Sequence, residues 1–113
     1  MSVASQGHHP RTRLDELIHH PVRLSIMAAL AGVAEAEFSV VRDAVEVSDS
    51  VLSRQVSALE VAGYVKVRKG YVGKRPRTWL RISARGRQAF ISHITALRDI
   101  AGMNNTSTPS EER

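Results

Sequence analysis

The chain has no cysteine. This absence excludes disulfides, thiolate nucleophiles and metal sites with cysteine ligands. No apolar run approaches the roughly 20 residues that a membrane-spanning helix needs. The N-terminus also lacks the apolar segment of a secretory signal. We therefore expect a cytoplasmic protein that has no membrane partner.

Acidic residues are missing from one long stretch of the chain. Between Glu60 and Asp99 there is no Asp or Glu, although the whole chain has a formal net charge of +5. The cations in this stretch are Lys66, Arg68, Lys69, Lys74, Arg75, Arg77, Arg81, Arg85, Arg87 and Arg98. A solvated surface normally mixes both signs, so this bias predicts an anionic partner.

A catalytic pattern is missing as well. Serines and histidines are scattered, and no pair of carboxylates is spaced to face one cleft. The acidic pairs Asp15-Glu16, Glu35/Glu37 and Glu111-Glu112 are typical of solvated charges. The sequence therefore predicts a protein that is not an enzyme and that needs no cofactor.

With 113 residues the chain is long enough for one domain. The polar, non-periodic residues 1–12 predict a flexible N-terminal tail. The folded domain is expected over residues 13–101. Residues 102–113 have the composition of a disordered C-terminal tail.

The most informative stretch is residues 48–65, which predicts a short helix that ends at Gly63. Ser48 or Asp49 can cap its N-terminus, and glycine is the usual residue just after a helix. Apolar residues recur at helical spacing and predict a buried stripe. They are Leu52, Val56 and Leu59.

The opposite face of this helix is small, polar and basic. It carries Ser50, Ser53, Arg54 and Ser57, with Gln55 at its edge. Short side chains let a helix enter a DNA groove, and arginine offers a forked donor to a base or a phosphate. Taken alone, the pattern also fits an ordinary amphipathic helix with a solvated face.

Four helical or extended segments are expected before this stretch. A helical pattern from Thr12 places Leu14, Leu17 and Ile18 on one face and breaks at Pro21, which then begins a second helix as far as Gly32. Residues 33–37 are ambiguous, residues 38–39 suggest a short strand, and Ser39 is a candidate cap for a helix to Val45. Two short helices joined by a turn form a helix-turn-helix.

After Gly63 the pattern alternates with period two. Residues 65–71 and 78–82 predict the strands of an antiparallel hairpin. The connecting loop, residues 72–77, carries Lys74, Arg75 and Arg77. A hairpin tip has no core to fill, so these cations are candidates for contact with an anion.

A last helix is expected from about Ala84 to Ala101, capped by Ser83. Its apolar face either packs on the helix over 21–32 or faces a second subunit. We favour the second interpretation, because a small chain cannot easily cover such a broad face. The predicted dimer interface comprises Leu14, Leu17, Ile18, Phe90, Ile91, Ile94, Leu97 and Ile100.

The five histidines leave an alternative open. His8, His9, His19, His20 and His93 could make the protein respond to a metal ion or to pH. No carboxylate at fixed spacing completes a metal-ligand set, so no metal site is assigned. A protein-interaction module that binds no DNA is a further alternative, against which the basic stretch argues.

The order helix, helix, helix, basic hairpin, helix resembles a winged helix-turn-helix, an α+β and mostly helical fold with a C-terminal dimerisation helix. The resemblance covers roughly residues 13–100 and is to the MarR (multiple antibiotic resistance) family, and more loosely to the ArsR family. The segments that carry it are 21–24, 52–65, 75–79 and 82–87. The terminal helices are shorter than in full-length MarR proteins, and the cysteines of metal-sensing ArsR proteins are missing.

The resemblance implies a homodimeric regulator, usually a repressor, that binds pseudo-palindromic double-stranded DNA. By analogy the outer face at 50–57 enters the major groove, and the hairpin cations reach the backbone or the minor groove. The short terminal helices predict that any pocket for a small-molecule effector is small or absent. The sequence identifies no such effector.

Overall fold

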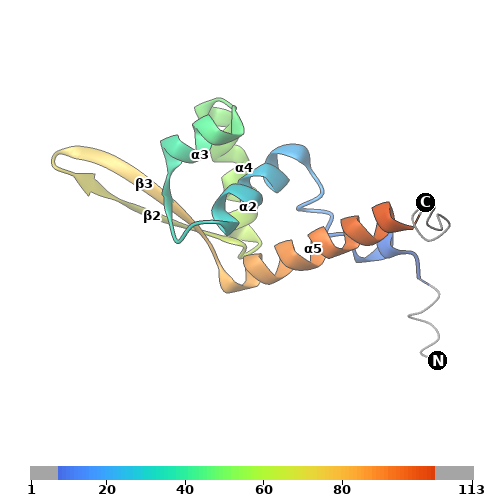
Figure 1. Ribbon diagram of the computed structural model, residues 1–113. Coiled ribbons are helices and arrows are strands. Elements are labelled where there is room, and N and C mark those ends of the chain that lie inside the picture. The colour runs from blue at the N-terminus through green and yellow to red at the C-terminus, as the bar shows by residue number, and fades with distance from the viewer. Residues whose placement is uncertain (1–7, 104–113) are drawn as a thin grey trace, which may run out of the picture.

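The computed structural model describes residues 8–103. They form four α-helices, a three-stranded antiparallel sheet and one short 3-10 helix (Figure 1). The elements are η1 (Pro10–Arg13), α2 (Pro21–Ala31), β1 (Ala36–Glu37), α3 (Phe38–Val45), α4 (Asp49–Val61), β2 (Val65–Val72), β3 (Arg75–Ile82) and α5 (Ala84–Gly102). This confirms the predicted winged helix-turn-helix. Residues 1–7 and 104–113, which make up most of the two predicted tails, lie outside the described range. The predicted N-terminal tail, residues 1–12, extends too far, because Pro10–Arg13 form η1, which contacts α5.

The core lies where α2, α3 and α4 meet the base of the sheet. The predicted stripe of α4, Leu52, Val56 and Leu59, is buried in it, as expected. The other buried apolar residues of this cluster are Ile18, Ile26, Met27, Leu30, Val41, Val65, Leu80 and Ile82. Truncating one such leucine to alanine typically costs about 2–5 kcal/mol of stability. The outer face of α4 is therefore held on a rigid support.

The helix predicted from Thr12 is wrong. Residues 10–13 form the 3-10 helix η1, and residues 14–20 make turns. The Asp15 carboxylate accepts hydrogen bonds from the backbone N–H groups of Leu17 (2.9 Å) and Ile18 (3.2 Å), which stabilises a turn in place of a helix. The helical spacing of the apolar residues here reflects contact with the core.

Helix α2 begins at Pro21, as predicted. His20 is its N-cap, and the His20 Nδ1 atom accepts from the backbone N–H groups of Val22 (3.2 Å) and Arg23 (3.3 Å). Proline at the first helical position has no N–H to satisfy and already has a helical φ.

The short strand before the helix-turn-helix lies two residues earlier than expected. Strand β1 is Ala36–Glu37, and it pairs with Leu80 and Trp79 of β3. Phe38 already begins α3, so Ser39 is not its cap. Glu37 occupies the cap position without a side-chain bond to the helix. The position of β1 along the chain is therefore set by its pairing with β3.

The hairpin is longer and its turn tighter than predicted. Strands β2 and β3 stay paired as far as Val72 and Arg75, which leaves a two-residue turn at Gly73-Lys74. Gly73 has a φ of 63°, which favours glycine. Figure 1 shows this hairpin, the wing, projecting away from the helices. Arg75 and Arg77 therefore lie on a strand, not in a flexible loop.

Helix α5 is joined closely to the end of α4. The Ser83 hydroxyl caps α5 by accepting from the Gly86 N–H (2.9 Å), as predicted, and donates to the Gly63 carbonyl (2.6 Å). Gly86 packs so tightly on the Tyr64 backbone that a Cβ would collide with it. From this joint, α5 runs away from the wing (Figure 1).

Candidate nucleic-acid interface

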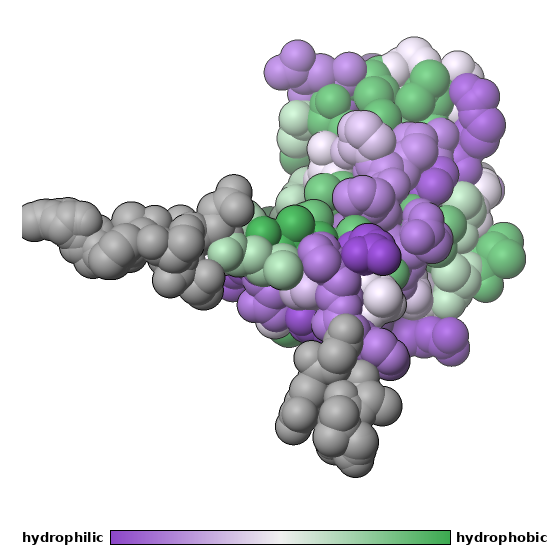
Figure 2. Space-filling model, turned by 90° about the vertical axis from the view of Figure 1, so that its right-hand side faces the viewer, coloured by the Kyte–Doolittle hydropathy of each residue, from purple (hydrophilic) through white to green (hydrophobic). Residues whose placement is uncertain are grey.

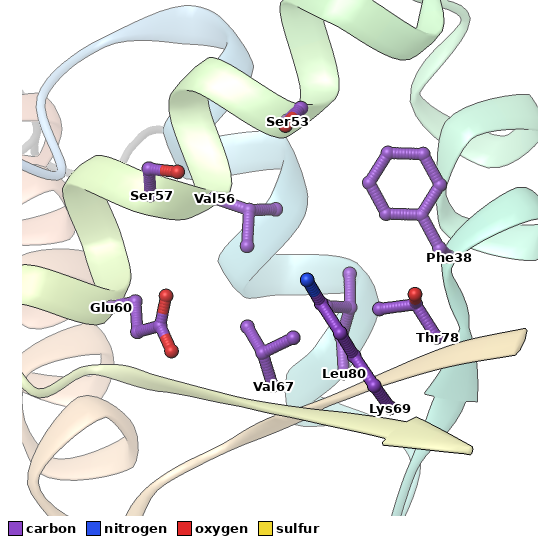
Figure 3. Close-up of a pocket in the computed structure, with 9 residues that line it drawn as sticks. All are labelled: Phe38, Ser53, Val56, Ser57, Glu60, Val67, Lys69, Thr78 and Leu80. Carbon is purple, nitrogen blue, oxygen red and sulfur yellow. The ribbon is translucent and has the colours of Figure 1, made fainter.

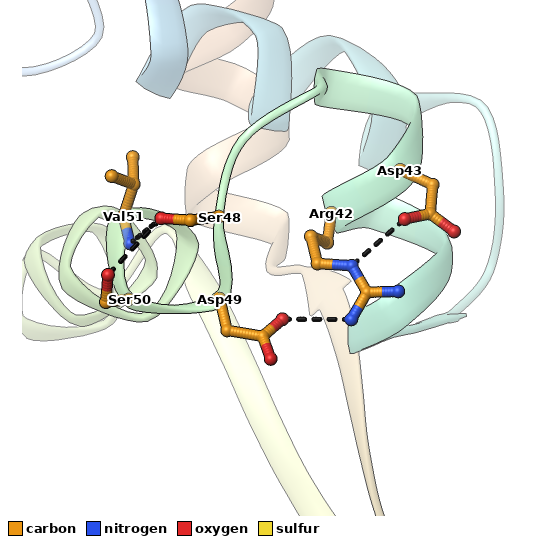
Figure 4. A network of polar contacts seen from close by, with 6 residues as sticks. All are labelled: Arg42, Asp43, Ser48, Asp49, Ser50 and Val51. Atoms are coloured by element: carbon orange, nitrogen blue, oxygen red, sulfur yellow. Dashed lines mark hydrogen bonds and ion pairs between the residues drawn. The ribbon is translucent and has the colours of Figure 1, made fainter.

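The N-terminus of α4 is fixed by a small polar network (Figure 4). The Ser48 hydroxyl accepts from the Val51 N–H at 3.2 Å, so Ser48 is the cap. Arg42 of α3 pairs with Asp49 at 2.9 Å and with Asp43 at 2.9 Å. These bonds, first that to Asp43, raise the pKa of Arg42. Of these contacts, only the Arg42–Asp49 pair spans the turn between the two helices of the helix-turn-helix.

The outer face of α4 carries the predicted DNA-reading residues in accessible positions. Ser50, Ser53, Arg54 and Ser57 are exposed, on the side opposite the buried stripe. Within residues 8–103, no hydrogen bond or ion pair holds the Arg54 guanidinium. A free guanidinium between short side chains can bind a base edge in a groove.

Gln55 differs from its neighbours because its side chain is already bonded. Arg23 of α2 donates to the Gln55 side-chain oxygen at 2.7 Å, and also to the Leu17 carbonyl at 2.6 Å. Gln55 is half-buried. The bidentate amide contact to adenine needs both ends of the glutamine amide, so DNA would have to displace Arg23.

Two of the three predicted wing cations lie at the tip of the hairpin. Lys74 and Arg75 are exposed, and no ion pair holds either side chain in the described part of the chain. Arg77 lies two residues further along β3, where its Nε atom is 3.4 Å from a Glu37 carboxylate oxygen. The tip cations are therefore available to an anion, and Arg77 is partly neutralised.

Arg68, at the base of the wing, is held on two sides. It makes two hydrogen bonds to the Glu35 carboxylate, at 2.7 and 3.1 Å, and its guanidinium lies 4.1 Å from the centre of the Trp79 ring. The hydrogen bond from Arg68 keeps the pKa of Glu35 below its ordinary value. Arg68 therefore braces the sheet, and its charge is not free for a polyanion.

A hollow of about 300 Å³ separates α4 from the wing (Figure 3). Apolar side chains form part of its lining, and polar ones come from α4 and both wing strands. The residues are Phe38, Ser53, Val56, Ser57, Glu60, Val67, Lys69, Thr78 and Leu80. Ser53 and Ser57 therefore belong both to this hollow and to the outer face of α4.

A family model for a winged helix DNA-binding domain matches residues 22–101. The chain belongs to this family. The match covers every element from α2 to α5 except Pro21 and Gly102. Family and fold are those of transcriptional regulators, not of enzymes.

Solved structures share the arrangement of this winged-helix domain. The transcriptional regulator homologue protein from Pyrococcus horikoshii OT3 is 26% identical with a TM-score of 0.72, over 83% of this chain and 91% of that one. A MarR-family regulator from Silicibacter pomeroyi is 20% identical with a TM-score of 0.61, over 91% and 69%. MosR of M. tuberculosis, solved in complex with DNA, is 16% identical with a TM-score of 0.65, over 97% and 79%. The fold is that of MarR-family regulators, as the resemblance implied.

The predicted dimer residues of the winged-helix domain differ in exposure. Ile91 is 52% exposed, whereas Ile18 has no exposed surface and belongs to the chain's own core. The remaining six are partly buried: Leu14, Leu17, Phe90, Ile94, Leu97 and Ile100. Figure 2 shows apolar side chains gathered beside the point where the described chain ends. A partner could still cover part of the α5 face, but Ile18 is not accessible to one.

Several residues of this winged-helix domain were missed by sequence reasoning. They are three arginines that hold residues in or beside the interface: Arg23 bonds to Gln55, Arg42 to Asp49 and Arg68 to Glu35. The alternating pattern predicted both strands of the hairpin, but Arg68 lies opposite Trp79 only because the turn is as short as Gly73-Lys74, which the sequence pattern did not predict. The partners of Arg23 and Arg42 have no signal in the sequence pattern.

Two kinds of feature are absent from the described residues. No helix in residues 8–103 is long and apolar enough to cross a membrane. The same residues contain no group of three or more His, Asp or Glu side chains placed to hold a metal ion.

Proposed function

We propose that the protein is a homodimeric transcriptional repressor of MarR type that binds a pseudo-palindromic operator in double-stranded DNA. The observation that carries this proposal is that Arg54 on the exposed face of α4, and Lys74 and Arg75 at the wing tip, make no ion pair within residues 8–103. A surface that keeps its cations free of acidic neighbours is suited to phosphates and base edges.

The two parts of this surface have different tasks. Helix α4 enters the major groove, where Arg54 donates to a base edge and the serines contact bases or phosphates. Lys74 and Arg75 displace counterions from the backbone beside that groove or in the adjacent minor groove, which gives affinity without sequence information. Gln55 contributes only if DNA displaces Arg23.

Dimerisation gives the protein two copies of this surface. Helix α5 carries Ile91, Ile94 and Leu97 on a face that its own chain covers only in part. Pairing two such faces buries apolar surface, and each Å² removed from water contributes about 25 cal/mol to the stability of the dimer. In the dimer the two recognition helices lie roughly 34 Å apart, about one turn of B-DNA. As a repressor, the dimer acts on chromosomal DNA in the cytoplasm.

A selection experiment tests the proposal. The full-length protein is incubated with fragmented genomic DNA of its host, and the bound fragments are sequenced. We expect enrichment of one motif with two inverted halves about one DNA turn apart. Band shifts on the enriched duplex and on the same duplex with scrambled halves then give the specificity ratio.

The mass of the free protein is measured in parallel. Analytical ultracentrifugation of a dimer agrees with the proposal, and a monomer that binds single half-sites contradicts its homodimer part. Equal affinity for the enriched and the scrambled duplex would contradict sequence-specific binding.

A further inference from the structure

His93 of α5 is a buried titratable group that lies away from the DNA-reading face. Its side chain has no exposed surface. The Nδ1 atom accepts a hydrogen bond from the backbone N–H of Asp15 at 3.0 Å. The Nε2 atom is also buried and has no hydrogen-bond partner among the described residues. A buried polar atom without a partner is rare and costly.

Asp15 connects this histidine to the end of the recognition helix. Its carboxylate accepts a hydrogen bond from the Tyr64 hydroxyl at 2.6 Å. Tyr64 follows Gly63, directly after the C-terminal end of α4. The Tyr64–Asp15–His93 link therefore joins α5 to α4 through the turn segment 14–20. It lies near the Ser83–Gly63 joint, which connects the same two helices.

We propose that the Tyr64–Asp15–His93 link positions the recognition helix relative to α5, and that protonation of His93 opens the link and releases DNA. The inference rests on the proposed function, because it assumes that α4 binds an operator and that α5 joins two subunits. His93 and Tyr64 are positioning residues, since neither lies on the face that would touch DNA.

Hydrogen-bond chemistry makes the link sensitive to a proton. Because Nδ1 accepts from an N–H group, the neutral ring must carry its proton on Nε2. Protonation adds a hydrogen to Nδ1, where it would point at the Asp15 N–H. Two donors then face each other, so the bond between α5 and Asp15 is lost. The ring also becomes a cation without any access to water.

The surroundings of His93 set the direction of its titration. Burial, and then the neighbouring His19 ring at 5.3 Å, lower the pKa of His93 below its ordinary 6.5, whereas Asp15 and Glu16 act against this shift. On neighbouring elements, Arg13 of η1 is paired with Asp99 of α5, and Arg85 acts on Tyr64.

A lowered histidine pKa means that the native state binds fewer protons than the unfolded state just below pH 6.5. The link contributes its full stability above that pH and loses it as the pH falls through the pKa of the folded protein. The bond from Tyr64 to Asp15 raises the pKa of Tyr64, so the tyrosine stays protonated throughout this range.

The predicted response has an unusual sign. Acidification makes the net charge of any protein more positive, which by itself strengthens binding to a polyanion. A loss of DNA affinity on acidification therefore distinguishes opening of the link from this general effect. His20 is a second histidine at a structural position, because it caps α2.

The test measures affinity for the selected operator duplex from about pH 7.5 to about pH 5.5, which brackets histidine titration. We expect the wild-type protein to lose affinity on the order of tenfold, which corresponds to about 1.4 kcal/mol of binding free energy. In His93→Asn, the amide oxygen can still accept from Asp15 but does not titrate, so the loss should disappear. His20→Asn keeps a capping oxygen and should behave as wild type.

Two further variants sharpen the test. His19→Asn removes a neighbouring charge, so the midpoint of the affinity loss should move to higher pH. Tyr64→Phe keeps the ring and removes the bond to Asp15, so it should weaken binding several-fold at both ends of the range. Unchanged or rising wild-type affinity on acidification would overturn the proposal, as would an undiminished loss in His93→Asn.

A measurement on the free protein separates this proposal from the proposed function. Hydrogen exchange should show the Asp15 amide protected at the higher pH and unprotected at the lower one, while the core of α2 stays protected. A protein without operator binding at the higher pH contradicts the proposed function. An Asp15 amide that stays protected, or a chain that unfolds globally at the lower pH, contradicts the link.

Discussion

The base and the tip of the wing carry similar charges but hold them differently. At the base, Arg68 is fixed by Glu35 and Trp79, and Arg77 is drawn toward Glu37. At the tip, Lys74 and Arg75 have no acidic partner among residues 8–103. The comparison teaches that a count of positive charges overstates the cations available to DNA. Arg54 on α4 belongs with the free group, and Arg23 and Arg42 belong with the fixed one.

The largest effect is expected from a free arginine. Arg54→Ala should lower affinity for the operator by on the order of 100-fold in the dimer, because each base contact contributes about 1–3 kcal/mol. Affinity for scrambled DNA should change far less. Arg54→Lys is the matched variant, since it keeps the charge and loses the fork. Band shifts on both duplexes measure the ratio, and an unchanged ratio in Arg54→Ala would exclude Arg54 as the reader.

The tip of the wing should give the second largest effect. Replacing Lys74 and Arg75 together by alanine should weaken binding to operator and scrambled duplexes alike, by about tenfold or more at moderate salt. The salt dependence of the affinity should also flatten, by about one unit of slope for each lost phosphate contact. Titrations over a range of salt concentrations measure the slope. A selective loss on the operator duplex would show that the tip reads sequence.

A change at the base should affect stability more than binding. Arg68→Ala removes the bonds to Glu35 and the contact with Trp79, so we expect a lower melting temperature and a salt dependence close to that of wild type. Arg68→Lys keeps the charge, and should also melt earlier because lysine cannot make the bidentate bond. A slope as flat as that of the tip variant would show that Arg68 binds DNA after all.

The smallest effect is expected from an acid. Glu37→Gln removes the partner of Arg77, so Arg77 should become available and DNA affinity should rise by about twofold at low salt, as surface ion pairs are weak. Glu37→Asp is the matched variant, because it keeps the negative charge at this position and should leave the affinity close to that of wild type. A fall in affinity in Glu37→Gln would show that the ion pair orients Arg77 for DNA.

Much of the fold follows from local sequence signals. Ser48 and Gly63 mark the ends of α4, and the alternation after Gly63 marks the wing. The segment 14–20 could not be predicted in the same way, because its hydrogen bonds reach residues far along the chain. The Asp15 carboxylate accepts from the Tyr64 hydroxyl, and the Asp15 N–H donates to His93. Helical spacing of Leu14, Leu17 and Ile18 was therefore misleading.

In the candidate site, the sequence predicted mainly the residues whose side chains make no ion pair within residues 8–103. An exposed residue such as Arg54 needs no partner, so helical periodicity is enough to locate it. A fixed residue such as Arg68 meets Glu35 only after β1 has paired with β3, and no local pattern contains that contact. The roles of Ser50, Ser53, Ser57 and the tip cations in DNA binding remain predictions.

A small change at the joint between α4 and α5 would displace the far end of α5. Helix α5 has 19 residues, so it is about 28 Å long at 1.5 Å per residue. A tilt of roughly 5° at Gly86 would move the far end of the helix, about 24 Å away, by about 2 Å by simple lever geometry. In a dimer joined through these helices, substitutions around Gly86 and Tyr64 would therefore retune the spacing of operator half-sites without altering any residue that touches DNA.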